Sequence, residues 1–180
     1  LIDATTTIEE DLRSVKSEEE IRLIQKACEI AEEGMKTALQ AVKPGITELE
    51  VASLAEHKMI TLGSDELRHA MGVASGYRSR LTHAFATQKR IEKGDVVTID
   101  LGAVYQGYCS DIARTFVVGK PDEEQRSAFN AFRDAQDEAI KKLRPGVTID
   151  ELQALPREFL KPTGFSIVGH MGHSIGLSNE

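Results

Sequence analysis

Residues 96–118 have the sequence VVTIDLGAVYQGYCSDIARTFVV. The first part is apolar and rich in β-branched residues, Gln106-Gly107 can form a tight turn, and a second apolar segment then returns, which together predict one β-hairpin. Asp100 and Asp111 interrupt the two apolar arms. With the turn placed there, Asp100 pairs with Ala113, and Asp111 lies two residues from Ala113 on the same face of the hairpin.

Two carboxylates on one face of apolar strands repel each other unless one is protonated or a cation lies between them. Diagonal neighbours on one face are separated by about 7–8 Å at the backbone, so Asp100 and Asp111 can converge on a shared ligand. The alternative is an exposed strand edge on which both carboxylates are solvated. Because apolar residues flank both aspartates, the pattern favours a cation and predicts a metal site.

The composition indicates a single globular domain. The chain has 180 residues, of which 41% are hydrophobic, and a net charge of −7. Such a chain can bury a sizeable core. The acidic balance and the lack of a basic cluster flanked by aromatic residues argue against a nucleic-acid partner. No run of eighteen apolar residues and no signal peptide is present, so we expect no membrane partner and a cytoplasmic location. Cys28 and Cys109 are expected to be reduced thiols.

Two acidic runs, at residues 18–20 and 122–124, are expected at helix starts. Negative side chains there oppose the positive end of the helix dipole. Ser17 and Glu20 form a capping-box pattern ahead of apolar residues at helical spacing, which predicts that a long amphipathic helix begins at this point.

An internal repeat indicates two similar halves. KPGITELE at residues 43–50 and RPGVTIDE at residues 144–151 are 101 residues apart, and they share a Pro-Gly turn and a Thr-x-x-Glu capping box. Each copy follows an amphipathic helical pattern and opens a new helix. The repeat predicts two halves, each built of two helices and a strand, with a cleft between them that would suit a ligand.

Four segments make the chain similar to the catalytic domain of the Xaa-Pro peptidases, prolidase and aminopeptidase P, which are relatives of methionine aminopeptidase. They are residues 13–27, ASGYRSRLTHA at 74–84, residues 93–119 and GHSIGL at 172–177. The resemblance implies an α+β "pita-bread" fold of the creatinase and aminopeptidase type, with two pseudo-symmetric halves. It also implies that residues 1–11 end a connection from an N-terminal domain. Residues 12–180 would then be a catalytic domain that is incomplete at its C-terminus.

In that family two Asp, one His and two Glu hold two divalent ions. The resemblance implies that Asp100, Asp111 and His173 are the first three ligands, with His173 contributed by the second half. Oxygen-rich ligation favours manganese, with cobalt or zinc as alternatives. The family's two glutamates would follow residue 180, and Glu180 is given no ligand role. With three of five ligands, the chain alone is expected to be inactive.

The other histidines differ in what their positions imply. The resemblance implies that His83 lines the substrate pocket and holds the substrate or assists proton transfer. His170 is a candidate substrate-binding residue, although it precedes His173 by three residues where the family has four. His57, in a predicted helix, and His69 are expected to be surface or structural residues.

The resemblance implies a dinuclear metallopeptidase that hydrolyses the bond preceding proline by a metal-activated water. Its substrate would be a peptide with proline at the second position, and a homodimer is usual in the family. A catalytically inactive relative that binds a peptide or protein in the same cleft is the alternative, motivated by the incomplete ligand set. A metal-free hydrolase like creatinase is disfavoured because Asp100 and Asp111 are both present. The sequence does not distinguish dipeptides from longer substrates.

Overall fold

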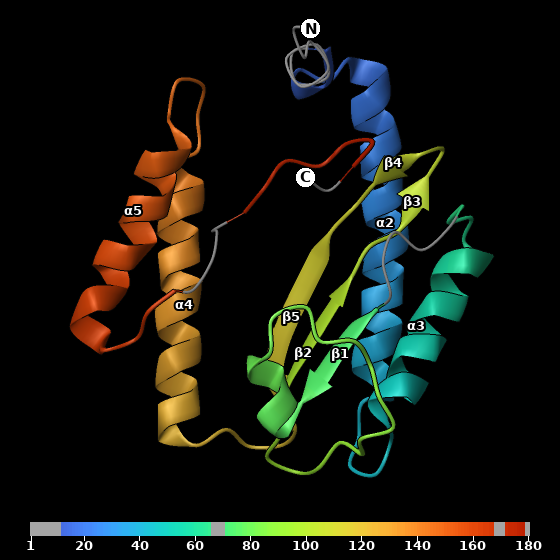
Figure 1. Ribbon diagram of the computed structural model, residues 1–180, viewed down its shortest axis with the longest axis vertical. Coiled ribbons are helices and arrows are strands. Elements are labelled where there is room, and N and C mark those ends of the chain that lie inside the picture. The colour runs from blue at the N-terminus through green and yellow to red at the C-terminus, as the bar shows by residue number, and fades with distance from the viewer. Residues whose placement is uncertain (1–11, 66–70, 168–171, 179–180) are drawn as a thin grey trace, which may run out of the picture. The chain divides into compact units, whose positions relative to one another are not determined.

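The computed structural model describes residues 12–65, 71–167 and 172–178 (Figure 1). It divides into two compact units. The first comprises Leu1–Gly119 and Ser174–Glu180, and the second comprises Lys120–His173. The hairpin that carries Asp100 and Asp111 belongs entirely to the first unit.

Two capped helices build one layer of the first unit. α2 (Glu18–Ala41) begins after Ser17, and α3 (Glu48–Thr61) begins after Thr47. In both, the hydroxyl of the capping residue accepts a hydrogen bond from the backbone N–H three residues on, and the glutamate at that position accepts one from the capping residue's N–H. These reciprocal bonds satisfy N–H groups that a helix start leaves open. Both predicted helix starts are confirmed.

The two helices pack closely where α2 has small residues. Gly34 is buried on α2, and a Cβ atom at this position would lie 2.6 Å from Cγ and 2.8 Å from Sδ of Met59 on α3. Ala31 and Ala38, one helical turn to either side, are also fully buried. Glycine at this point therefore allows the Met59 side chain to cross α2.

Gly34→Leu is expected to lower the midpoint of thermal unfolding, because overpacking a dense core costs about 1–3 kcal/mol. Gln40→Leu, at an exposed position of the same helix, is the control and should leave the midpoint unchanged. Combining Gly34→Leu with Met59→Ala should recover part of the loss, because the two side chains compete for one space. Circular dichroism measures the midpoint of thermal unfolding of each variant. If Gly34→Leu and the wild type have equal midpoints, the two helices are not packed this closely.

The sheet of the first unit is antiparallel in the order β1-β2-β5. Its strands are β1 (Gly72–Ser75), β2 (Val96–Leu101) and β5 (Ile112–Val117). Two short strands, β3 (Val104–Tyr105) and β4 (Tyr108–Cys109), extend the hairpin of β2 and β5.

The register of this hairpin is the predicted one, with Asp100 opposite Ala113. The turn residues Gln106 and Gly107 have φ values of 48° and 81°. Positive φ at both central residues is the requirement of a type I′ turn, whose twist matches that of the flanking strands. The predicted hairpin and its turn are therefore confirmed.

The helices cover one face of the sheet (Figure 1). Along β2, Val97, Ile99 and Leu101 are fully buried, whereas Thr98 and Asp100, which alternate with them, are half-buried. The residues buried together come from both helices, the sheet and the segment before β2: Ile30, Ala31, Met35, Ala38, Val51, Ala52, Ala55, Met59, Val73, Ile91, Val97, Ile99 and Leu101. Because side chains of a strand alternate between faces, Asp100 lies on the face away from the helices.

The second unit contains a helical hairpin of α4 (Glu123–Lys142) and α5 (Ile149–Leu160), followed by the 3₁₀ helix η2 (Lys161–Thr163). Asp122 caps α4, and Thr148 caps α5 with the same reciprocal bonds that Thr47 makes at α3. The helical part of the predicted repeat is thus confirmed in both units. No strand occurs at residues 120–167 or 172–173, so the strand predicted for this half and the cleft between the halves stay predictions.

Two further expectations concern the cysteines and the membrane. Cys28 is exposed and Cys109 is buried, and no disulfide bond joins them. Among the described ranges, no helix combines the length and the apolar character needed to cross a bilayer.

Candidate active site

Asp100 lies at a point where four segments of the first unit run side by side. Ala113 of β5 pairs with Asp100, Gly72 of β1 pairs with its other side, and Phe85 forms an isolated bridge with Gly72. Neighbouring strands are about 4.7–4.9 Å apart. The segment that leads to Phe85, which carries His83, is therefore only one strand away from Asp100.

Gly72 makes this close approach possible. A Cβ atom on Gly72 would lie 3.1 Å from Cβ of Asp100, 3.3 Å from its carbonyl oxygen and 3.5 Å from the carbonyl oxygen of Ala84. A larger residue would push the strand of Asp100 and the segment of Ala84 apart. Gly72 is not among the site residues that the sequence predicts, although a glycine in a strand is a known sign of close backbone approach.

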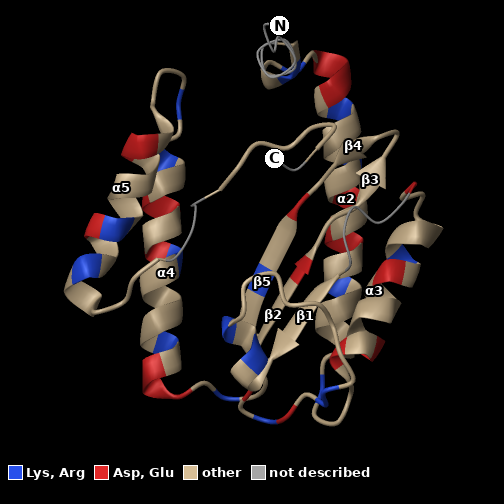
Figure 2. Ribbon diagram, in the orientation of Figure 1, with Lys and Arg blue, Asp and Glu red and all other residues tan. Residues whose placement is uncertain are grey.

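Asp111 follows Ser110 and directly precedes β5. The hairpin strands are interrupted at residues 102–103 and 110–111. The register is the same on both sides of this interruption, because Leu101 pairs with Ile112 and Val104 pairs with Cys109. Strand alternation then places Asp111 on the face of Asp100. Both aspartates are half-buried. The sequence of β2 contains a single charged residue, Asp100, and Figure 2 shows the colour of acidic residues on this strand.

The face that carries the two aspartates is lined by small and polar residues. Thr98 and Thr115 are cross-strand neighbours whose hydroxyl oxygens are 3.2 Å apart, and Ala113 and Thr115 are exposed. Small side chains leave room beside the carboxylates. Carboxylate oxygens are the ligands that hard divalent cations prefer, so the pair fits such an ion.

His83 lies in the turn that follows the 3₁₀ helix η1 (Gly76–Arg80), and its side chain is exposed. Its φ is 52°, which is uncommon for a residue other than glycine. A left-handed residue of this kind costs of order 1 kcal/mol or more and persists only where the surroundings hold it. The predicted loop position of His83 is therefore confirmed, while its role stays a prediction.

His173 belongs to the second unit and is exposed. The residues that follow it return to the first unit, where the backbone N–H of Cys109 donates to the carbonyl oxygen of Gly176 at 2.7 Å. Arg13 donates to the hydroxyl of Ser178 at 3.0 Å in the same segment. The segment after His173 is thus fixed to β4, two residues before Asp111.

The remaining histidines divide between described and undescribed parts of the chain. His57 is exposed on α3, as expected for a surface residue. His170, His69 and Glu180 lie outside the described residues. Within the described part, no three side chains of His, Cys, Asp or Glu come together as a metal-binding group. The structure therefore brings Asp100 and Asp111 to one face of a hairpin, and the addition of His173 to them stays a prediction.

The chain matches a known protein family. Residues 22–180 match metallopeptidase family M24. The chain belongs to this family, and the fold it contributes to is the pita-bread fold of prolidases and aminopeptidase P.

Individual relatives of the chain include Xaa-Pro peptidases. The Xaa-Pro dipeptidase of Pyrococcus furiosus is 43% identical over 169 residues, which are 93% of this chain and 49% of the relative. The solved structure of a prolidase from Pyrococcus furiosus superimposes with a TM-score of 0.95 at 41% identity, over 97% of this chain and 52% of the other. The X-Pro aminopeptidase of Thermotoga maritima gives a TM-score of 0.91 at 38% identity, over 96% and 50% of the two chains. The chain therefore spans about half the length of these relatives.

Proposed function

We propose that this chain is part of a metal-dependent peptidase that cleaves the bond preceding proline in peptides with proline at the second position. The observation that carries the proposal is the Asp100–Asp111 pair on one face of a hairpin, in a chain that belongs to metallopeptidase family M24. The 43% identity to a dipeptidase that acts on Xaa-Pro substrates supports the substrate class. No observation favours the inactive binding module.

Asp100 and Asp111 would hold divalent metal, and His173 would supply the third side chain. The attachment of Gly176 to Cys109 supports this set, because it fixes the segment that His173 precedes to the strand that leads to Asp111. We propose two ions and manganese as the metal, on the grounds of the oxygen-rich ligands. Bound divalent ions supply Lewis acidity, which polarises a carbonyl group and makes water acidic enough to act near neutral pH.

His83 would contact the substrate, because its loop lies one strand from Asp100. Its imidazole can donate or accept a proton near neutral pH and can hold a substrate carbonyl or carboxylate. His170 is proposed as a further substrate-binding residue. A homodimer remains the expectation from the family resemblance, and a cytoplasmic location remains the expectation from the sequence.

The test is hydrolysis of paired dipeptides by the full-length protein, one with proline and one with alanine at the second position. We expect turnover of the Xaa-Pro dipeptide alone, loss of turnover after chelation, and recovery with manganese. Binding of Xaa-Pro dipeptides without cleavage by the metal-loaded protein would favour the binding module instead. Equal turnover of both dipeptides would contradict the proposed substrate class.

A further inference from the structure

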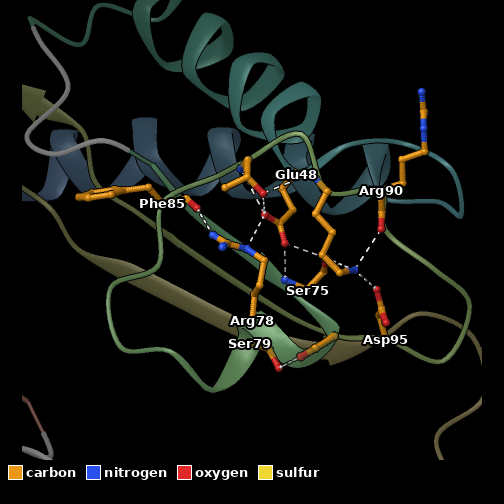
Figure 3. Close-up of polar contacts among 10 residues, drawn as sticks. Glu48, Ser75, Arg78, Ser79, Phe85, Arg90 and Asp95 are labelled. Atoms are coloured by element: carbon orange, nitrogen blue, oxygen red, sulfur yellow. Dashed lines mark hydrogen bonds and ion pairs between the residues drawn. The ribbon is translucent and has the colours of Figure 1, made fainter.

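Glu48 is an acidic residue whose side chain is fully buried in the first unit, and Figure 3 shows its polar contacts. It is the first residue of α3, but the capping box of that helix is formed by Thr47 and Glu50. Burying a carboxylate is costly unless it is paired and hydrogen-bonded. The start of the helix therefore does not explain why an acid is buried at this position.

The hydrogen bonds of Glu48 go to both ends of the loop that carries His83. One oxygen, Oε1, accepts from the backbone N–H and the hydroxyl of Ser75, both at 2.8 Å. The other, Oε2, accepts from Nε of Arg78 at 3.1 Å and from the N–H and hydroxyl of Thr87 at 3.2 and 2.7 Å. Ser75 precedes the loop and Thr87 follows it, so a single carboxylate joins the two ends.

Arg78 extends this connection across the loop. While its Nε bonds Glu48, its Nη2 donates to the carbonyl oxygen of Phe85 at 2.7 Å. Phe85 is the residue that bridges Gly72, which in turn pairs with Asp100. The guanidinium group thus ties the first turn of the loop to the point where the loop meets the sheet, and His83 lies between them.

A second ion pair fixes the base of the loop. Nζ of Lys89 donates to the hydroxyl of Ser75 at 3.0 Å and to Oδ2 of Asp95 at 2.8 Å. A Cβ atom on Gly76, whose φ is +57°, would lie 2.7 Å from Oδ1 of Asp95. With two acids and two bases, the cluster around Glu48 is balanced in charge, and its hydrogen bonds fix the loop on both sides.

We propose that Glu48 is a positioning residue, which anchors the loop of residues 76–86 so that the segment of His83 is held against β1, one strand away from Asp100. This proposal rests on the proposed function, since it takes His83 to contact the substrate. Four of the five hydrogen bonds that Glu48 accepts come from the two residues that flank this loop, and the fifth comes from Arg78 within it. A buried ion pair often adds no stability over apolar residues of similar volume, so we attribute the role of Glu48 to the placement of the loop.

The test compares Glu48→Gln with Glu50→Gln in the full-length protein. Glu48→Gln keeps the size of the side chain but removes its charge. One of the two acceptor oxygens becomes an amide NH₂ group, so donors of Ser75, Arg78 or Thr87 lose their acceptor. We expect tryptic cleavage after Arg78 and Arg80, measured on the native protein by mass spectrometry, to rise by about tenfold. Buried donors left without an acceptor favour opening of the loop by a factor of this order. The value of kcat on an Xaa-Pro dipeptide should fall by at least about tenfold for the same reason, while metal content stays at the wild-type level.

Two variants complete the test. Glu50→Gln weakens the cap of the same helix without touching the loop, and it should change neither loop cleavage nor kcat. Thr87→Val removes one of the five hydrogen bonds of Glu48 and keeps its ion pair with Arg78. It should shift both readouts in the same direction by a smaller amount, and it carries the test if Glu48→Gln does not fold.

The outcomes separate this proposal from the one on which it rests. Wild-type loop cleavage and kcat in Glu48→Gln, or equal loosening of the loop in Glu50→Gln, would overturn the positioning role of Glu48 in an active enzyme. Absence of hydrolysis in the wild-type protein would overturn the proposed function, and the catalytic meaning of the anchor with it. A tenfold rise in tryptic cleavage of the loop in Glu48→Gln, together with a lower kcat and unchanged metal content, would support both the positioning role of Glu48 and the proposed function.

Discussion

Asp100→Asn and Asp111→Asn, each in the full-length protein, are expected to abolish metal binding and peptidase activity. Each change keeps the shape of the side chain but removes an anionic ligand from a pair that lies on one face of the hairpin. Metal ligation by carboxylates depends on their charge, and metal binding is coupled to folding. The measurements are metal content per chain by elemental analysis and turnover of an Xaa-Pro dipeptide.

The effect of the same variants on the free energy of unfolding should depend on whether metal is present. Without metal, two neighbouring carboxylates repel each other, and replacing one by Asn removes this repulsion. With manganese at one hundred times its dissociation constant, the wild type gains about 2.7 kcal/mol that a non-binding variant does not. Urea unfolding with manganese and with chelator measures both effects.

Glu92→Gln provides the control, since Glu92 is an exposed acid in the turn before β2. It should leave metal content, turnover and the metal-dependent stabilisation unchanged. Retention of two metals per chain with normal turnover in Asp100→Asn or Asp111→Asn would reject the ligand assignment.

The hairpin and the helix starts could be predicted because their determinants are local. The pairing of Asp100 with Ala113 follows from the two-residue turn and from the alternation of side chains along a strand. The caps at Thr47 and Thr148 follow from residues three positions apart. Information of this kind is contained within a few neighbouring residues, so a single sequence is sufficient.

The surroundings of His83 could not be predicted in the same way. Its loop is placed by the bridge between Gly72 and Phe85 and by bonds from Glu48 to residues 27 to 39 positions away. In the sequence, Glu48 is one more acid at a helix start, where an exposed side chain is the ordinary expectation. Its burial depends on which loop packs over it, which no local pattern contains.

His173→Ala and His83→Ala are expected to give different kinetic results, because one residue is proposed as a ligand and the other as a substrate contact. His173→Ala should lower the affinity for metal, so that excess manganese restores part of the rate. The measurement is turnover as a function of manganese concentration. A rate that is low at every concentration, with metal still bound, would contradict the role of ligand.

His83→Ala should leave metal content intact and lower kcat by about 10²–10⁴-fold if the imidazole takes part in proton transfer. Because His83 has a φ of 52°, Ala at this position also changes the backbone preference of the turn. His83→Asn separates the two effects, since Asn tolerates the left-handed region but cannot transfer a proton as imidazole does. Equal losses in the Ala and Asn variants would identify the imidazole as the cause. Full activity in His83→Asn, or loss of metal in either variant, would overturn the assignment.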